Sequence, residues 1–144
     1  MNDTAIKDLK ILVVEDEEFM LNMIVRLLKN FDIQTITTAL NGQDALQEME
    51  EAKEKSQLEF DLIFCDLEMP IMDGFQFLKN LRGSADTGNR NVPVIILTGH
   101  GDKEHFGEAL ELGFHGFLVK PVTLESLEKI LQICSNKKLF LFKG

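Results

Sequence analysis

Three acidic residues follow two short apolar runs in this chain. Glu15 and Asp16 come directly after Ile11-Leu-Val-Val14, and Asp66 comes directly after Leu62-Ile-Phe-Cys65. Such runs are typical of strands that are buried on both faces of a sheet. Three close carboxylates repel one another unless a cation lies among them, and their hard oxygens are ligands that Mg²⁺ prefers. The spacing therefore indicates a divalent-cation site.

Two further apolar runs end on residues of complementary chemistry. Pro93-Val-Ile-Ile-Leu97 is followed by Thr98, and Gly116-Phe-Leu-Val119 is followed by Lys120. A hydroxyl group and an ammonium group can hold the oxygens of an anion opposite a metal. Carboxylate, cation, lysine and hydroxyl around one point form a phosphoryl-transfer site, where catalysis is positioning and charge neutralisation.

Each of these residues also has an ordinary structural explanation when it is considered alone. Asp66 can cap the helix that follows it, and the acidic pair can be the charged first turn of a helix. Thr98 can be a turn residue, and Lys120 can be a surface residue before a proline. The functional interpretation is favoured because all of these residues stand at strand ends, which a parallel sheet brings to one edge.

Apolar periodicity alternates between strand-like and helix-like along the chain. Strands are expected at 11–14, 33–39, 62–65, 93–97 and 116–119, and helices at about 20–31, 45–52, 75–81, 102–112 and 124–134. Residues 1–9 are expected to form a loose leader, and 83–91 a polar loop. We expect residues 1–144 to be a single domain with a core at about 9–134 and a tail at 135–144.

Five successive strand–helix units predict the α/β class, with a doubly wound, five-stranded parallel sheet. For a chain this short, the flavodoxin-like strand order 2-1-3-4-5 fits best. In that order the first and third strands are neighbours, and ligands bind where the order reverses. Asp66 is therefore predicted to face this crevice together with Glu15 and Asp16.

Composition excludes several classes of protein. The net charge is −9, and the longest basic run is Lys137-Lys138, which argues against a nucleic-acid-binding surface. Cys65 and Cys134 lie in apolar segments without metal-ligand spacing, so both are expected in the core. The N-terminus lacks signal-peptide features, and no run has the length of a membrane span. We expect a cytoplasmic protein without membrane attachment.

The motifs resemble the receiver domain of two-component response regulators, over about residues 9–134. The matching segments are Ile11-Leu-Val-Val-Glu-Asp-Glu17, Asp61 to Gly74 with its Asp-Leu-Glu-Met-Pro core, Val94-Ile-Ile-Leu-Thr-Gly99 and Gly116-Phe-Leu-Val-Lys-Pro121. The resemblance implies the (βα)5 receiver fold. It also implies that Asp66 accepts a phosphoryl group from a histidine kinase or histidine phosphotransfer protein. The implied ligands of Mg²⁺ or Mn²⁺ are Glu15, Asp16, Asp66 and the backbone carbonyl of Glu68.

The remaining roles also follow from the resemblance. Thr98 and Lys120 would contact phosphoryl oxygens, and the peptide before Pro121 would be cis. Phe117 stands at the switch aromatic, which moves inward as Thr98 moves toward the phosphoryl group. The surface formed by the helix at 102–112, the strand at 116–119 and the last helix would then control an unknown downstream protein.

Two further positions, Glu68 and His100, would tune how long the phosphoryl group persists. The resemblance implies no enzyme beyond self-directed phosphotransfer and autodephosphorylation. It also implies a monomer or a weak phosphorylation-dependent dimer. One departure from the family pattern is Glu15, which stands where aspartate is most common.

Three other functions compete with this interpretation. The first is an interaction module with the receiver fold that works without phosphorylation, against which intact Asp66, Thr98 and Lys120 count. The second is a haloacid-dehalogenase-type phosphatase, which needs an aspartate at the position of Glu68. The third is a flavin-binding protein, whose phosphate loop after the first strand would be repelled by the acids found there.

Overall fold

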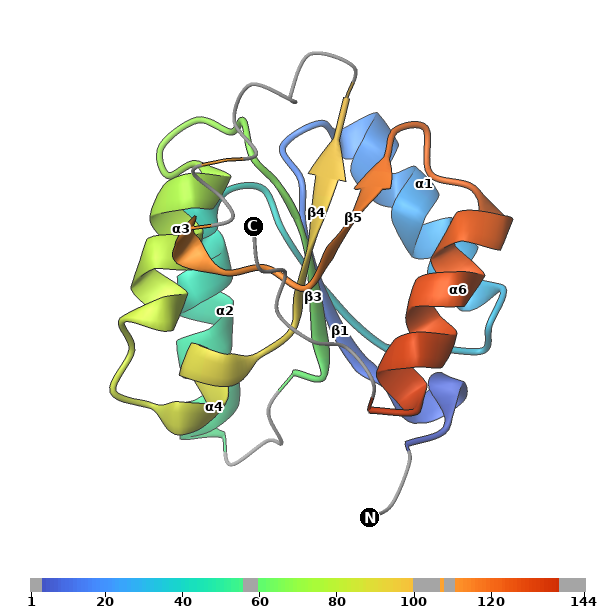
Figure 1. Ribbon diagram of the computed structural model, residues 1–144, viewed down its shortest axis with the longest axis horizontal. Coiled ribbons are helices and arrows are strands. Elements are labelled where there is room, and N and C mark those ends of the chain that lie inside the picture. Colours follow the sequence, from blue (N-terminus) through green and yellow to red (C-terminus); the bar gives the residue numbers. More distant parts are fainter. Residues whose placement is uncertain (1–3, 56–59, 100–106, 108–110, 138–144) are drawn as a thin grey trace.

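The structure, a computed structural model, describes residues 4–55, 60–99, 107 and 111–137 (Figure 1). Five parallel strands form one sheet in the order β2-β1-β3-β4-β5. The strands are β1 (Lys10–Val14), β2 (Thr35–Ala39), β3 (Leu62–Asp66), β4 (Val94–Thr98) and β5 (Gly116–Val119). The predicted fold class and strand order are confirmed.

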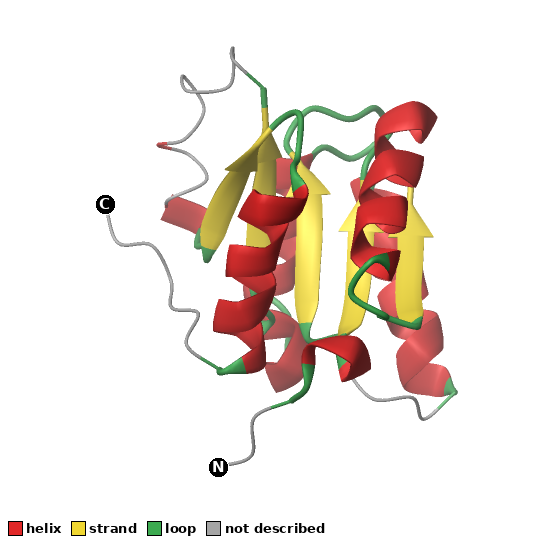
Figure 2. Cartoon of the chain, turned by 90° about the vertical axis from the view of Figure 1, so that its right-hand side faces the viewer, coloured by secondary structure: helices red, strands yellow, loops and turns green. Residues whose placement is uncertain are grey.

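Helices cover both faces of the sheet, as Figures 1 and 2 show. One face packs against α1 (Glu18–Lys29) and α6 (Leu124–Ser135), and the other against α2 (Gly42–Glu54) and α3 (Gly74–Arg82). Along β1, Ile11 and Val13 belong to the first core cluster, whereas Leu12 and Val14 belong to the second. Both faces of a central strand are therefore buried, which explains its unbroken apolar run.

Polar side chains cap the first turns of three helices. Asp73 and Thr123 each form a capping box, at the first turn of α3 and α6, respectively. Asn41 caps α2 by accepting a hydrogen bond from the backbone N–H of Asp44. Cys65 and Cys134 are buried free thiols, as predicted.

The predictions of irregular structure at residues 1–9 and 83–91 are wrong in part. The leader is ordered from Thr4, since Ile6–Asp8 form the 3₁₀ helix η1 and Leu9 is buried in the core. The backbone N–H of Thr4 donates to the carbonyl of Ser135 at 3.2 Å, which joins this segment to α6. The polar segment 83–91 contains a short helix, α4 (Thr87–Asn91), capped by Asp86. Most of the helix predicted at 102–112 and the tail from 138 lie outside the described residues.

Arg82 connects segments at the end of the sheet opposite the predicted site. Its guanidinium donates to the backbone carbonyls of Gly113, Arg90 and Val92. Burial lowers its pKa to about 10. The neighbouring His115 accepts a hydrogen bond from the Val94 backbone N–H at Nδ1, and burial together with Arg82 lowers its pKa to about 4. The sequence analysis did not identify this junction.

The loop after β3 is held tightly against that strand. The N–H of Gly74 donates to the carbonyl of Leu67 at 2.9 Å. A methyl group at Gly74 would lie 2.8 Å from the Cα of Leu67 and would collide with the carbonyl oxygen of Asp66. Only a glycine allows α3 to begin this close to the strand end that carries Asp66.

We predict that Gly74→Ala destabilises the protein by about 2 kcal/mol or more, because the methyl group meets backbone rather than a flexible side chain. Gly107→Ala is the control, since a methyl group there meets no atom of the described residues within 4 Å. Urea unfolding of both variants measures the difference. Equal stabilities would contradict the close approach.

Candidate functional site

Strand register brings the acidic residues together. In the parallel pair β1–β3, Val14 lies opposite Cys65. The next residue on each strand is therefore an acid, Glu15 on one side and Asp66 on the other. These two strands are the neighbours at which the strand order reverses, where open α/β sheets bind ligands.

The three predicted carboxylates form one cluster. Glu15, Asp16 and Asp66 each offer an oxygen, and these oxygens lie within 4.8 Å of one another. Glu15 is 0% exposed and Asp66 is 7% exposed, whereas Asp16 is half-buried. Two of the three carboxylates are thus removed from most of the water that would otherwise screen their repulsion.

Lys120 supplies the positive charge within this cluster. Its Nζ lies 2.7 Å from Oε1 of Glu15 and 2.9 Å from Oδ2 of Asp66. Pairing of β5 with β4 positions this lysine. Val119 lies opposite Thr98, and the N–H of Lys120 donates to the Thr98 carbonyl at 2.6 Å. The peptide between Lys120 and Pro121 is cis, as the resemblance implied.

The pKa values of Glu15 and Lys120 are both shifted by their surroundings. Burial raises the pKa of Glu15 to about 7, with Asp66 adding to the increase and Lys120 opposing it. Burial acts to lower the pKa of Lys120, but the adjacent Glu15 and Asp66 carboxylates outweigh that effect, and the pKa is raised. Near neutral pH, the Glu15 carboxyl is therefore poised to exchange a proton.

The donor set fits a divalent cation. Besides the three carboxylates, the segment after Asp66 lies close by, because the Glu68 N–H donates to Asp66 Oδ1 at 3.3 Å. Oε1 of Glu15 is buried and, despite the nearby ammonium group, accepts no hydrogen bond of regular geometry from the described residues. An all-oxygen site with spare lone pairs suits Mg²⁺ or Mn²⁺ and lacks the soft ligands that zinc favours.

The other predicted residues are placed as follows. Thr98 is buried at the end of β4, on the strand beside Asp66. Phe117 lies on β5 and is 41% exposed, so its ring is not packed inward in this structure. The Glu68 side chain is exposed, and His100 lies outside the described residues.

Two features of the site were missed. The sequence analysis paired Lys120 with an anion rather than with Glu15, because the register between β4 and β5 cannot be read from one chain. Gly74 entered the sequence analysis only as the end of the matching segment Asp61 to Gly74, without a structural role. The sequence signal for this close approach is the Asp73-Gly74 pair at the end of the loop, where the backbone returns to Asp66.

A family model described as "Response regulator receiver domain" matches residues 11–132. Chemotaxis protein CheY-3 of Vibrio cholerae is 32% identical over 125 residues, covering 87% of this chain and 90% of that protein. The osmosensing histidine protein kinase SLN1 of Saccharomyces cerevisiae is 36% identical over 130 residues, covering 90% of this chain. Those residues span only 10% of SLN1, so the chain corresponds to a small part of that relative.

A solved structure adds a metal to the comparison. The receiver domain of sensor histidine kinase PA1611 from Pseudomonas aeruginosa superimposes with a TM-score of 0.76 at 26% identity. The match covers 90% of this chain and 98% of that one. That receiver domain has a magnesium ion coordinated in its active-site cleft.

Among the described residues of the present chain, no helix is long and apolar enough to cross a membrane.

We predict that Glu15 makes the metal-free protein less stable as pH rises from about 4.5 to about 7. Its pKa is about 7 when folded, against a reference value of 4.5, so the folded state binds more protons in this window. Stability therefore falls as pH rises through it, by up to about 3 kcal/mol in total.

The measurement is the difference in unfolding free energy between wild type and Glu15→Gln in EDTA, as a function of pH. Taking the difference matters because His115, with its lowered pKa, makes stability rise with pH from about 4 to 6.5. The Glu15 contribution has the opposite sign. A difference that does not change with pH would contradict the burial of an ionisable Glu15.

Proposed function

The chain belongs to the family of response regulator receiver domains, and on that premise we propose that Asp66 accepts a phosphoryl group in a Mg²⁺-dependent reaction. As a member of this family it is a receiver domain of two-component signalling rather than a classical enzyme. The donor would be a phosphohistidine on a histidine kinase or a histidine phosphotransfer protein.

One observation carries the proposal, namely the position of Lys120 between two carboxylates. Its Nζ contacts Glu15 at 2.7 Å and Asp66 at 2.9 Å, so a cation already lies where negative charge converges. A capping or surface role for these residues would not bring an ammonium group and three carboxylates to one point. An arriving phosphoryl group needs such an environment, because its oxygens carry the charge of the transition state.

The proposed reaction exchanges one bond for another. A carboxylate oxygen of Asp66 attacks phosphorus, the bond between phosphorus and the donor imidazole nitrogen breaks, and an acyl phosphate forms on Asp66. The imidazole nitrogen leaves with the electron pair of the broken bond. Lys120 and Thr98 hold phosphoryl oxygens, and Lys120 exchanges its contact with the Asp66 carboxylate for one with the phosphoryl group.

Glu15, Asp16, Asp66 and the carbonyl of Glu68 are the groups that would hold the metal. When bound, Mg²⁺ would neutralise charge between the carboxylates and the phosphoryl oxygens. A cation at this position would lower the pKa of Glu15 from about 7, so metal binding near pH 7 would release a proton from Glu15. This proton release can be measured by titration calorimetry in buffers of different ionisation enthalpy.

Partner and output assignments remain predictions. We propose that Thr98 and Phe117 change position together on phosphorylation, and that the surface around β5 and α6 then controls a downstream protein. The exposed ring of Phe117 is compatible with such a change. Cytoplasmic location, and a monomer or weak phosphorylation-dependent dimer without nucleic-acid binding, also stay as predicted from the sequence.

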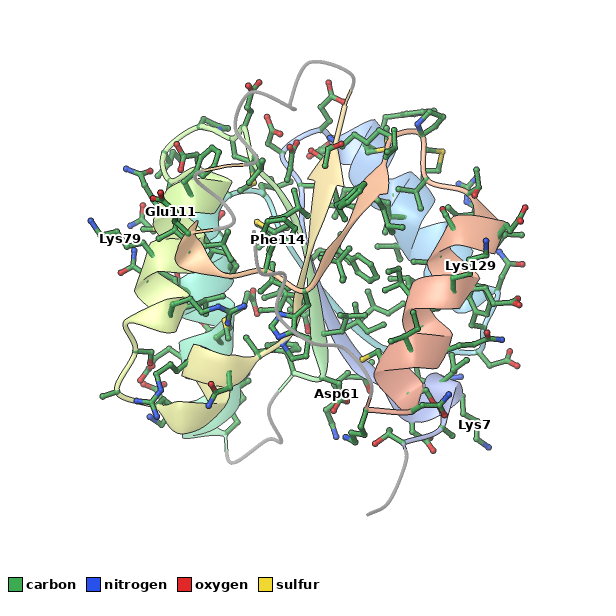
Figure 3. The ribbon with its side chains drawn as sticks, viewed as in Figure 1. Lys7, Asp61, Lys79, Glu111, Phe114 and Lys129 are labelled. Carbon is green, nitrogen blue, oxygen red and sulfur yellow. The ribbon has the colours of Figure 1, made fainter. Side chains whose placement is uncertain are left out.

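We predict that acetyl phosphate with Mg²⁺ adds one phosphoryl group to the wild type and none to Asp66→Asn. The matched control is Asp61→Asn, directly before β3 and at the opposite end of the sheet (Figure 3). There Asp61 accepts a hydrogen bond from the Lys10 N–H. Intact mass measures both. Continued labelling of Asp66→Asn would overturn the assignment, and loss of label in the Asp61 variant would indicate a folding defect.

Asp16→Asn, in the same assay, is expected to weaken Mg²⁺ binding and labelling together. Removing one carboxylate also relieves repulsion, so its melting temperature in EDTA should rise. A variant that melts lower and labels normally would argue against a metal site at this cluster.

We predict that Glu68 prolongs the phosphorylated state by obstructing the water that attacks phosphorus from the side away from Asp66. Glu68→Ala keeps the backbone N–H that donates to Asp66 and should speed phosphate loss several-fold. Adding His100→Ala should increase the effect only slightly. The measurement is decay of the phosphorylated protein in Mg²⁺ after the donor is removed.

Glu68→Gln separates the two causes of obstruction. If the negative charge of Glu68 causes the obstruction, Gln accelerates decay as Ala does. If bulk obstructs, only Ala accelerates it. Unchanged decay in Glu68→Ala would end the proposal, and slower decay would mean that the carboxylate assists the water.

A further inference from the structure

A groove of about 500 Å³ opens at the carboxyl end of β2, between α1 and α2. These two helices lie on opposite faces of the sheet (Figure 1). The groove, which both helices and the end of β2 line, therefore lies at the edge of the sheet rather than on one face. None of the residues proposed to bind the metal or the phosphoryl group lines it. The groove is therefore a separate feature of the surface.

The floor of the groove is the unpaired edge of β2. Within the described part of the chain, β2 pairs only with β1 and ends the sheet. The Ala39 carbonyl accepts from the Glu15 N–H at 3.0 Å, so the backbone groups of Ala39 point toward β1. Because successive residues of a strand alternate in this respect, the N–H and C=O groups of Thr38 and Ile36 point outward.

This edge lacks the usual protection against strand addition. Natural edge strands carry lysine, proline or a bulge that prevents another chain from pairing. The sequence of β2 is Thr-Ile-Thr-Thr-Ala, with none of these residues, and all five of its residues pair with β1 in regular register. Beside its end, Leu40 is 40% exposed and lines the groove, so an apolar contact is also available.

The walls are acidic. The charged residues that line the groove are Glu18, Asp44, Glu48 and Glu51, with no lysine or arginine. Among the described residues, none of these four carboxylates lies within ion-pair distance of a basic side chain. Three of them share one face of α2, separated by four and three residues, or about 6 Å and 4.5 Å along the axis.

We propose that the outer edge of β2 binds an extended, basic segment of a partner protein as an additional strand. Backbone groups of the segment pair with Thr38 and Ile36, as in known recognition by strand addition. Alternate side chains of a strand lie about 6.6 Å apart on one face. Lysine or arginine at every second position therefore matches the acidic residues of α2, and charge complementarity selects this occupant.

The test uses a fluorescent peptide with blocked ends, Lys-Thr-Lys-Val-Lys-Thr-Lys, titrated with the full chain and followed by anisotropy. Glu48→Gln/Glu51→Gln should weaken binding about fivefold, as expected for two exposed ion pairs. The matched control is Glu125→Gln/Glu128→Gln, which removes two charges at the same spacing from α6, on the other side of the sheet. This control should leave the affinity unchanged.

Backbone pairing is tested separately by two N-methylated peptides, one methylated at the lysines and the other at the intervening residues. A strand directs alternate N–H groups toward its neighbour, so only one of these peptides should lose binding. Loss in neither would show that charge alone attracts the peptide and would overturn the proposal. Equal weakening by the α6 control would overturn it in the same way.

Three further outcomes would each reject a basic segment as the occupant. The first is no binding of the peptide at low salt. The second is full displacement by spermidine at equal charge concentration, which would indicate a small polycation. The third is self-association of the free chain that is lost in the α2 double variant, which would indicate a second copy at this edge. Acetyl phosphate labelling should be the same in both double variants, so failure here leaves the proposed role of Asp66 untouched.

Discussion

The structure depends on the electrostatics of three carboxylates that the fold forces together. Pairing of β1 with β3 leaves Glu15 and Asp66 side by side, and Glu15 is fully buried. Such a cluster is unfavourable unless positive charge is present. In the metal-free chain that charge is Lys120, delivered from the end of β5 by pairing with β4. The same repulsion that Lys120 offsets is what a divalent cation would relieve.

The rest of the molecule supports this arrangement by making the strand ends rigid. The central strands are buried on both faces, between α1 and α6 on one side and α2 and α3 on the other (Figure 1). The loop after β3 is tied back by the Gly74 N–H and turns at Ile71, whose φ is 70°. A β-branched residue rarely adopts that conformation, and Ile71 is also 75% exposed. The loop beside Asp66 therefore holds strain, as is common near functional sites.

Acidic residues act in two different environments in this chain. At the strand ends they are desolvated, and the pKa of Glu15 is raised to about 7. In the groove beside β2, the carboxylates of α2 remain near water, where each ion pair contributes little and specificity needs several contacts. The net charge of −9 thus includes both a buried acidic cluster and an exposed acidic groove.

The sequence alone predicted the sheet, its strand order and the gathering of acidic residues and Lys120 at one end of it, because strongly apolar runs that end on such residues leave few arrangements. Parallel strands deliver such ends to one edge whatever the details of packing. It could not determine that Lys120 contacts Glu15, that Gly74 touches the backbone of Asp66, or that Thr4 joins α6. Nor did it reveal the helix at Thr87–Asn91 or the acidic groove beside β2. These features depend on contacts between residues distant in sequence, whose geometry is set only when the helices and strands pack together.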